Sequence, residues 1–208
     1  MIRALSRVVA TVVSKPLWWL RLHGTENIPA KDSGGCIVAS NHQTYLDPIW
    51  ICIPILHRLR FMAFDEAFEW RFLGPLMRYL GAFPVALDGA GAIKAVKEAL
   101  RTLKSGAALI VFPEGEREFA DGRYLPFKTG VARIAIQAGV PILPVTIEGG
   151  NRIWPQGQTL PRLFRRLDIT YHPLLYPTED NSIDQHTAIE DLTQRLRAAI
   201  ESASGTNT

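Results

Sequence analysis

Six short apolar runs separated by helical patterns constrain the fold of this chain more than any other feature. The runs are rich in β-branched or aromatic residues, and we interpret them as strands. They span residues 36–40, 60–64, 82–87, 107–112, 142–147 and 167–172. Helical patterns lie between most of them, at 48–57, 66–80, 91–106 and 129–139. Strands that alternate with helices predict an α/β fold, a single domain with a largely parallel, mixed sheet flanked by helices.

Several helix ends carry their own sequence signals. Gly106 and Gly139 are placed to end the third and fourth helical patterns. A last helix is predicted near the C-terminus, where Ser182 with Gln185 resembles a capping box. Its predicted buried face consists of Ile189, Leu192, Leu196 and Ile200. Residues 204–208 should form a frayed tail, which leaves 23–203 as the expected domain.

Charge and cysteine content narrow the possible functions. The 208 residues carry a net charge of only +3 and contain no basic run with interleaved aromatic residues, so no nucleic-acid partner is expected. A small positive surplus fits weak attraction to an acidic lipid surface. Cys36 and Cys52 lie among apolar residues outside any C-x-x-C pattern, which favours two buried free thiols over a disulfide or a metal site.

Residues 1–22 have the pattern of a basic amphipathic helix. Apolar residues recur there at helical spacing and are followed by Trp18 and Trp19, and no acid occurs before Glu26. The cations of this segment are Arg3, Arg7, Lys15 and Arg21. Such a helix suits the membrane interface, although a helix packed on the domain's own core is the alternative. Residues 149–166 are another apolar and basic stretch, which could be a second membrane contact or a solvated face with a few packed anchors.

The first segment with chemical potential follows the strand at 36–40 and reads S-N-H-Q-T-Y-L-D-P. Sites in α/β proteins form at the carboxyl ends of strands. There Asp47 could accept a hydrogen bond from one ring nitrogen of His42 and leave the other nitrogen as a base. The alternative is that Asp47 is a plain N-cap before Pro48. Because no G-x-S-x-G or H-E-x-x-H pattern occurs, the nucleophile should come from a substrate, and no metal is expected.

The second such segment follows the strand at 107–112. Gly115 permits close backbone approach, and Arg117 could hold a phosphate through two hydrogen bonds. Lys128 stands at the start of a helix, where free amides also favour anions. The alternative is a surface loop in which Glu114 and Arg117 form a routine pair.

Four segments, taken together and in order, resemble the lysophosphatidate acyltransferase (1-acyl-glycerol-3-phosphate O-acyltransferase) family. They are N-H-Q-T-Y-L-D, G-A-F-P-V-A-L-D, F-P-E-G-E-R-E and V-P-I-L-P-V, and the resemblance covers roughly residues 25–175. It implies a glycerolipid acyltransferase fold and transfer of a fatty acyl group to the hydroxyl of a lysolipid, in phospholipid biosynthesis. The donor would be acyl-CoA or acyl-ACP, used as a co-substrate without any cofactor. The implied location is the cytoplasmic face of a membrane, as a peripheral or monotopic protein.

The resemblance also assigns roles to individual residues. His42 would be the general base on the acceptor hydroxyl, and Asp47 would orient it. The implied substrate-binding residues are Phe83, Glu114, Gly115, Arg117, Lys128 and Pro144. Arg117 among them would bind the acceptor phosphate. Apolar residues of 49–56 and 72–80 could line a groove for the acyl chain.

Two cations that the family's pattern leads one to expect are absent. The second block reads Ala86, Leu87 and Asp88 where Arg is usual, and the preceding strand ends in Phe64 and Asp65 where Ala-Lys is usual. The resemblance makes 1-acyl-glycerol-3-phosphate the default acceptor, and the missing cations make another lysolipid or a hydroxylated aminolipid the alternative. A thioesterase and a non-catalytic lipid-binding module are the competing classes of function.

Overall fold

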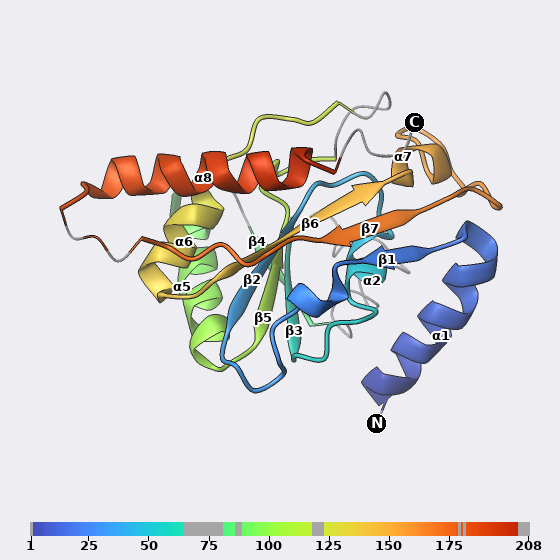
Figure 1. The fold of residues 1–208 in the computed structure, drawn as a ribbon, viewed down its shortest axis with the longest axis horizontal. Coiled ribbons are helices and arrows are strands. Elements are labelled where there is room, and N and C mark those ends of the chain that lie inside the picture. Colours follow the sequence, from blue (N-terminus) through green and yellow to red (C-terminus); the bar gives the residue numbers. More distant parts are fainter. Residues whose placement is uncertain are drawn as a thin grey trace.

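The computed structural model describes residues 2–64, 81–85, 89–117, 123–178, 180 and 182–203. The described strands form one sheet in the order β1-β7-β6-β2-β5-β3-β4 (Figure 1). Their bounds are Arg21–His23 for β1, Cys36–Ser40 for β2, Leu59–Phe64 for β3, Ala82–Val85 for β4, Ala108–Val111 for β5, Ile142–Glu148 for β6 and Asp168–Tyr171 for β7. The helices are α1 (Ile2–Trp18), α2 (Asp47–Ile51), α5 (Gly89–Lys104), α6 (Gly130–Ala138), α7 (Gly150–Ile153) and α8 (Gln185–Glu201), with a short 3₁₀ turn at Thr25–Asn27.

The sheet is parallel from β6 to β4 and reverses direction once. Strands β6, β2, β5, β3 and β4 pair in parallel, whereas β7 runs antiparallel to β6 and β1 runs parallel to β7. The starts of β7 and β1 therefore lie at the edge of the sheet where β6 and β2 end. The predicted α/β class with a largely parallel, mixed sheet is confirmed.

Both faces of the sheet are covered, which explains why the central strands read as continuous apolar runs. Every residue of β2 is buried, and successive side chains alternate between two cores. Cys36 and Val38 face a core that includes Trp18 and Trp50, on the side of α1 and α2. Ile37 and Ala39 face the other core, where α5, α6 and α8 pack, as Figure 1 shows.

The capping box predicted for the last helix is wrong. The N-cap of α8 is Asp184, whose Oδ1 accepts hydrogen bonds from the amides of His186 (2.9 Å) and Thr187 (3.1 Å). Ser182 instead donates its own amide to Asp180 Oδ1 at 2.8 Å, outside the helix. A carboxylate so placed accepts from two of the free N–H groups of the first turn.

Several predicted boundaries shift. The helix predicted over 48–57 ends at Ile51, because Pro54 cannot continue it. Strand β1 was not predicted, since three residues with only Leu22 half-buried carry no apolar pattern. Gly139 closes α6 with φ of 63°, as predicted, and Gly106, just beyond α5, has φ of 73°. The helix predicted at 66–80, residues 86–88 and the tail at 204–208 fall outside the described residues.

The two cysteines are free, as expected, but only one is buried. Cys36 lies in β2, and burial raises the pKa of its thiol to about 12. Cys52, just beyond α2, is only partly buried.

The end of α1 packs on the domain through Trp18, whereas the next residue, Trp19, does not pack on it. Trp18 is buried, meets Trp50 edge to face at a centroid distance of 5.4 Å, and donates its indole N–H to the carbonyl of Arg162. Trp19 is 58% exposed. The last turn of the helix thus packs on the core, and the next residue remains in solvent. Within the described ranges no helix combines the length and apolar character needed to cross a membrane.

Candidate active site

The turn between β2 and α2 is organised by one buried carboxylate. Asp47 Oδ2 accepts hydrogen bonds from the amides of Gln43 (2.6 Å) and Thr44 (2.7 Å), and Oδ1 accepts from Thr44 Oγ1 (2.7 Å). Asp47 is the first residue of α2, and its carboxylate folds back onto the preceding turn rather than onto the helix's own amides. The interpretation of Asp47 as a plain N-cap is therefore wrong.

The same carboxylate holds the imidazole of His42. His42 Nδ1 lies 2.9 Å from Asp47 Oδ2, and the ring stacks on Phe112 at a centroid distance of 4.0 Å. A carboxylate oxygen accepts, so Nδ1 carries the hydrogen and Nε2 keeps its lone pair. No described residue bonds Nε2, and the side chain is 19% exposed, which leaves the ring screened but reachable. The contact that the sequence predicted between these two residues is present.

Glu114 joins three loops behind the histidine. Its Oε1 accepts from the amide of His42 (3.0 Å), and its Oε2 accepts from the amide of Leu125 (2.8 Å). Burial raises the pKa of this carboxyl to about 7. The two amide hydrogen bonds lower the pKa, and the charge of the nearby Asp47 raises it further. Because both oxygens are occupied by backbone, Glu114 positions the His42 backbone and the loop around Leu125.

Gly115 makes room for a lysine. Its φ is 78°, and a Cβ added there would lie 2.5 Å from Lys128 Nζ. The backbone of Lys128 is fixed in turn, since its amide donates to the carbonyl of Pro113 at 2.9 Å. The exposed ammonium group of Lys128 therefore crosses directly over the glycine, in the loop that follows β5.

Arg117 is held by a residue that the sequence analysis did not single out. Its guanidinium carbon lies 3.9 Å from the centre of the Tyr45 ring, and its Nη2 donates to the Tyr45 hydroxyl at 3.1 Å. Tyr45 also meets Trp154 edge to face at 5.5 Å. The available signal was an aromatic residue between His42 and Asp47, in a turn predicted to be functional. Tyr45 thus links Arg117 to the turn that carries the His–Asp pair.

The two remaining predicted site residues lie elsewhere in the sheet. Phe83 of β4 is buried in the core beneath α5 and α6, with the guanidinium carbon of Arg60 5.4 Å above its ring. Pro144 pairs with Ala39 inside β6, and its carbonyl accepts from the amide of His172 at 2.9 Å. On the side that faces His172 only the carbonyl of this proline can take part in the pairing, one residue beyond the last pair between β6 and β7. No described contact joins either residue to His42.

No group of three or more His, Cys, Asp or Glu residues within the described ranges is arranged to hold a metal ion. What the structure brings together is an oriented imidazole, a buried carboxyl behind it and two cations, Arg117 and Lys128, on the neighbouring loop. An imidazole with a lone pair on Nε2 is suited to removing a proton from a hydroxyl group. Guanidinium and ammonium groups nearby are suited to binding a phosphate.

Comparison with known proteins agrees with this chemistry. A family model described as acyltransferase matches residues 20–148. The 1-acyl-sn-glycerol-3-phosphate acyltransferase BAT2, chloroplastic, of Brassica napus is 32% identical over 74% of this chain and 44% of its own length. The 1-acyl-sn-glycerol-3-phosphate acyltransferase of Bacillus subtilis (strain 168) is 28% identical over 67% of this chain and 69% of its own length. The chain thus spans less than half the length of the plant relative.

A solved structure has the same fold over the whole chain. The crystal structure of the 1-acyl-sn-glycerophosphate acyltransferase PlsC from Thermotoga maritima superposes with a TM-score of 0.72 at 25% identity. The superposition covers 100% of this chain and 85% of that chain.

Proposed function

The chain belongs to the acyltransferase family, and we propose that it moves a fatty acyl group from a thioester to the free hydroxyl of 1-acyl-sn-glycerol-3-phosphate. The observation that carries the proposal is the 2.9 Å contact between His42 Nδ1 and Asp47 Oδ2, beside a loop with two cations. Relatives and a solved structure whose names specify this acceptor support it. The donor would be acyl-CoA or acyl-ACP.

The reaction needs one base and no protein nucleophile. His42 Nε2 removes the proton from the acceptor hydroxyl while that oxygen attacks the carbonyl carbon of the thioester. The carbon–sulfur bond then breaks, and the thiolate takes the proton back from the imidazolium. The products are a diacylated lipid and a free thiol, so atoms and charge balance. General-base assistance of this kind contributes ~10²–10⁴ in rate.

The acceptor phosphate would meet the loop after β5. Arg117 offers a planar donor set that is already ordered on the Tyr45 ring, so less rotamer freedom is lost when it binds. Lys128 Nζ, against Gly115, offers a second positive charge on the same loop. We assign these two side chains to the phosphate and assign Glu114 to positioning of the His42 backbone.

The two family cations are absent near Phe64, Asp65 and Leu87, and this absence bears on which acceptor is bound. Losing a charge-assisted phosphate contact costs ~1.5–3 kcal/mol, so Arg117 and Lys128 would have to compensate. If they do not, a lysolipid with a different head group would be preferred. The acyl groove proposed from 49–56 and 72–80 falls in part outside the described residues.

We also propose that the protein works at the cytoplasmic face of a membrane, as a peripheral or monotopic protein. Both proposed lipids, the lysolipid and the diacylated product, are amphiphiles that reside in bilayers. Residues 1–22, whose Trp19 remains exposed at the end of α1, are proposed as one contact with that surface.

The test is acyl transfer by purified protein from a labelled acyl thioester, with lysophosphatidate and lysophosphatidylcholine offered side by side. Lysophosphatidate should be preferred, and His42→Ala should abolish transfer to it. His186→Ala is the matched control, because His186 is 79% exposed on α8 and should leave the rate unchanged. Hydrolysis of the thioester at a rate independent of any acceptor would favour a thioesterase instead.

A further inference from the structure

We propose that a single surface, built where the end of α1 meets the loop before β7, docks this protein on an anionic lipid bilayer. This surface is separate from the residues assigned to the reaction, and the proposal rests on the proposed function only in that a membrane is involved. The surface, called the docking patch below, has an apolar part and a basic rim. The apolar residues are Trp19, Leu160, Leu163 and Phe164, and the rim residues are Arg21, Arg162 and Arg165.

Backbone hydrogen bonds join the two segments of the patch into one unit. The amide of Phe164 donates to the carbonyl of Leu17 (2.7 Å), and the amide of Leu167 donates to the carbonyl of Trp18 (3.0 Å). The indole of Trp18 donates to the carbonyl of Arg162 at 2.9 Å from the other direction. Residues about 145 positions apart thus form a fixed platform, and the two apolar basic stretches of the sequence become one surface.

The platform presents large apolar side chains to solvent at a conformational cost. The exposed fractions are 58% for Trp19, 74% for Leu160, 46% for Leu163 and 58% for Phe164. Trp19 (φ 40°) and Phe164 (φ 56°) are also the two non-glycine residues with positive φ in the described part of the chain. Bulky residues rarely adopt this conformation, and here no burial of the rings compensates for it. Aromatic rings held out in this way are typical of sites that insert into a lipid interface.

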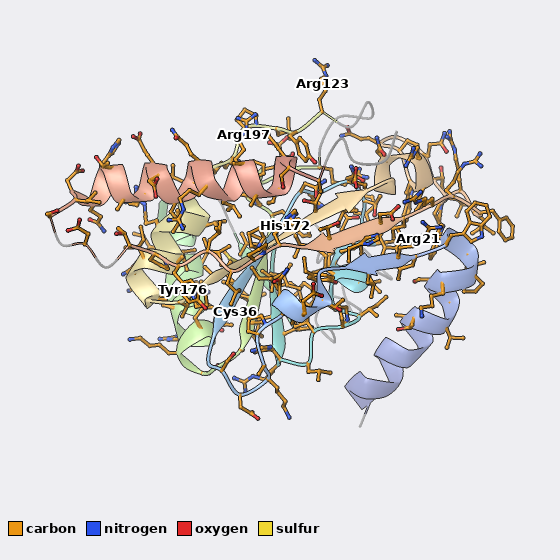
Figure 2. All side chains as sticks on the ribbon, in the orientation of Figure 1. Arg21, Cys36, Arg123, His172, Tyr176 and Arg197 are labelled. Carbon is orange, nitrogen blue, oxygen red and sulfur yellow. The ribbon has the colours of Figure 1, made fainter. Side chains whose placement is uncertain are left out.

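The charges around the patch select an anionic surface. Arg21, Arg162 and Arg165 are exposed, and Figure 2 shows Arg21 at the same end of the molecule as the join between α1 and β1. Two acids lie at the base of the patch. Asp168 is buried and bonded to Arg166 at 2.5 and 3.1 Å and to His23 at 3.0 Å. Glu148, its half-buried partner in the pairing of β6 with β7, interacts electrostatically with Arg166. An apolar centre with a cationic rim matches the acyl region and the acidic head groups of a bilayer.

The sheet reversal places the docking patch beside the candidate active site. Arg21 pairs with Asp168, and Asp168 pairs with Glu148 at the end of β6, so the patch lies at the edge where β2 and its turn end. In Figure 1 the loop from α7 to β7 and the end of α1 lie together at the right. The helix α7 that leads into the loop also donates the amide of Asn151 to Gln43 in the His42 turn, at 3.3 Å. A lipid leaving the bilayer at the patch would therefore reach the His42 turn over a short path.

The proposal is tested by flotation of the purified full chain with vesicles. One set consists of phosphatidylcholine, and the other contains about one third phosphatidylglycerol. We expect the wild type to float with the anionic vesicles. Asparagine tolerates positive φ, so the double variant Trp19→Asn/Phe164→Asn should still fold. Its affinity for the vesicles should decrease about tenfold or more. Tyr176→Asn is the matched control and should bind like the wild type, because Tyr176 is 60% exposed and lies at the left of Figure 2, at the opposite end of the view from Arg21.

A second pair of variants tests the rim. Arg162→Gln/Arg165→Gln should weaken binding to anionic vesicles about fivefold for each arginine and leave neutral vesicles unaffected. Arg101→Gln/Arg197→Gln removes the same charge from α5 and α8 and should have little effect. Equal losses from the two pairs would overturn the assignment of the rim.

Three outcomes would overturn the docking patch. The first is a wild type that floats with neither kind of vesicle, and the second is an asparagine variant that floats like the wild type. The third is a dimer in light scattering of the wild type that is absent in the asparagine variant, which would show that the patch binds a second copy of the chain. Flotation requires no turnover. Failure here would therefore leave the acyl-transfer assay valid, and failure of that assay would leave the flotation result valid.

Discussion

Replacing Glu114 with glutamine tests how a buried carboxyl governs the pH dependence of stability. Burial raises the pKa of Glu114 from an ordinary 4.5 to about 7, against the lowering effect of the amides of Leu125 and His42. Between these two values the folded protein holds a proton that the unfolded chain has released. The free energy of unfolding must therefore fall as pH rises through this window, the reverse of the usual carboxylate case.

The magnitude follows from the same two values. The difference between about 7 and 4.5, at about 1.4 kcal/mol for each pH unit, amounts to about 3–4 kcal/mol in total. Glu114→Gln cannot titrate, so its stability should lack this component. It should carry instead a constant cost of about 1–3 kcal/mol, because the amide NH₂ of glutamine would face one of the two backbone N–H groups.

Urea unfolding of both proteins between about pH 4.5 and 7.5 measures the effect. Other titrating groups are common to both proteins, so the difference between the two free energies isolates Glu114. We expect the wild type to lose about 3 kcal/mol relative to Glu114→Gln across this range. Glu116→Gln, at an exposed neighbouring position, should show a constant difference. If the difference in unfolding free energy were also constant for Glu114→Gln, the reasoning would be refuted, since the hydrogen bonds from the two amides would then have cancelled the effect of burial.

Three further substitutions give separate outcomes. Gly115→Ala should lower the free energy of unfolding by about 1–2 kcal/mol and raise the acceptor KM, because φ is 78° and the new Cβ would collide with Lys128. An unchanged acceptor KM would separate that lysine from the phosphate. Thr146→Val should cost about 2–5 kcal/mol in thermal unfolding, since the buried hydroxyl accepts from His172 and donates to a carbonyl of α8. Asp47→Asn should lower kcat ~10²–10⁴-fold with little change in KM, and a normal kcat would contradict an orienting role.

The parts of the site that the sequence predicted are local in the chain. His42 and Asp47 lie in one turn, so their spacing alone indicated that they could meet. The contact between Tyr45 and Arg117 joins residues 72 positions apart and depends on β2 and β5 being neighbours. Periodicity assigns residues to strands but does not order the strands, and this contact was therefore missed.

The same reasoning explains what was missed in the fold. The class of fold followed from alternating patterns, which depend on the faces of individual strands and helices. Strand β1 has three residues and a half-buried pattern, so nothing in its composition marked it as a strand. Without β1 the meeting of the end of α1 with residues 160–166 could not be predicted. At α8 the sequence analysis assigned the cap to Ser182, whereas in the structure the N-cap is Asp184, two residues later.

The pairing of β1 with β7 also orders events in time during synthesis. His23 and Asp168, which bond across these strands, are 145 residues apart, so β1 leaves the ribosome long before its partner exists. At about 5–20 residues per second, the interval is roughly seven to thirty seconds. Throughout it, α1 and Trp19 are tethered to a strand without a neighbour, while the rest of the sheet is still being made. The end of α1 and strand β1 are therefore made early but fixed late, and they are free to meet other surfaces before β7 pairs with β1.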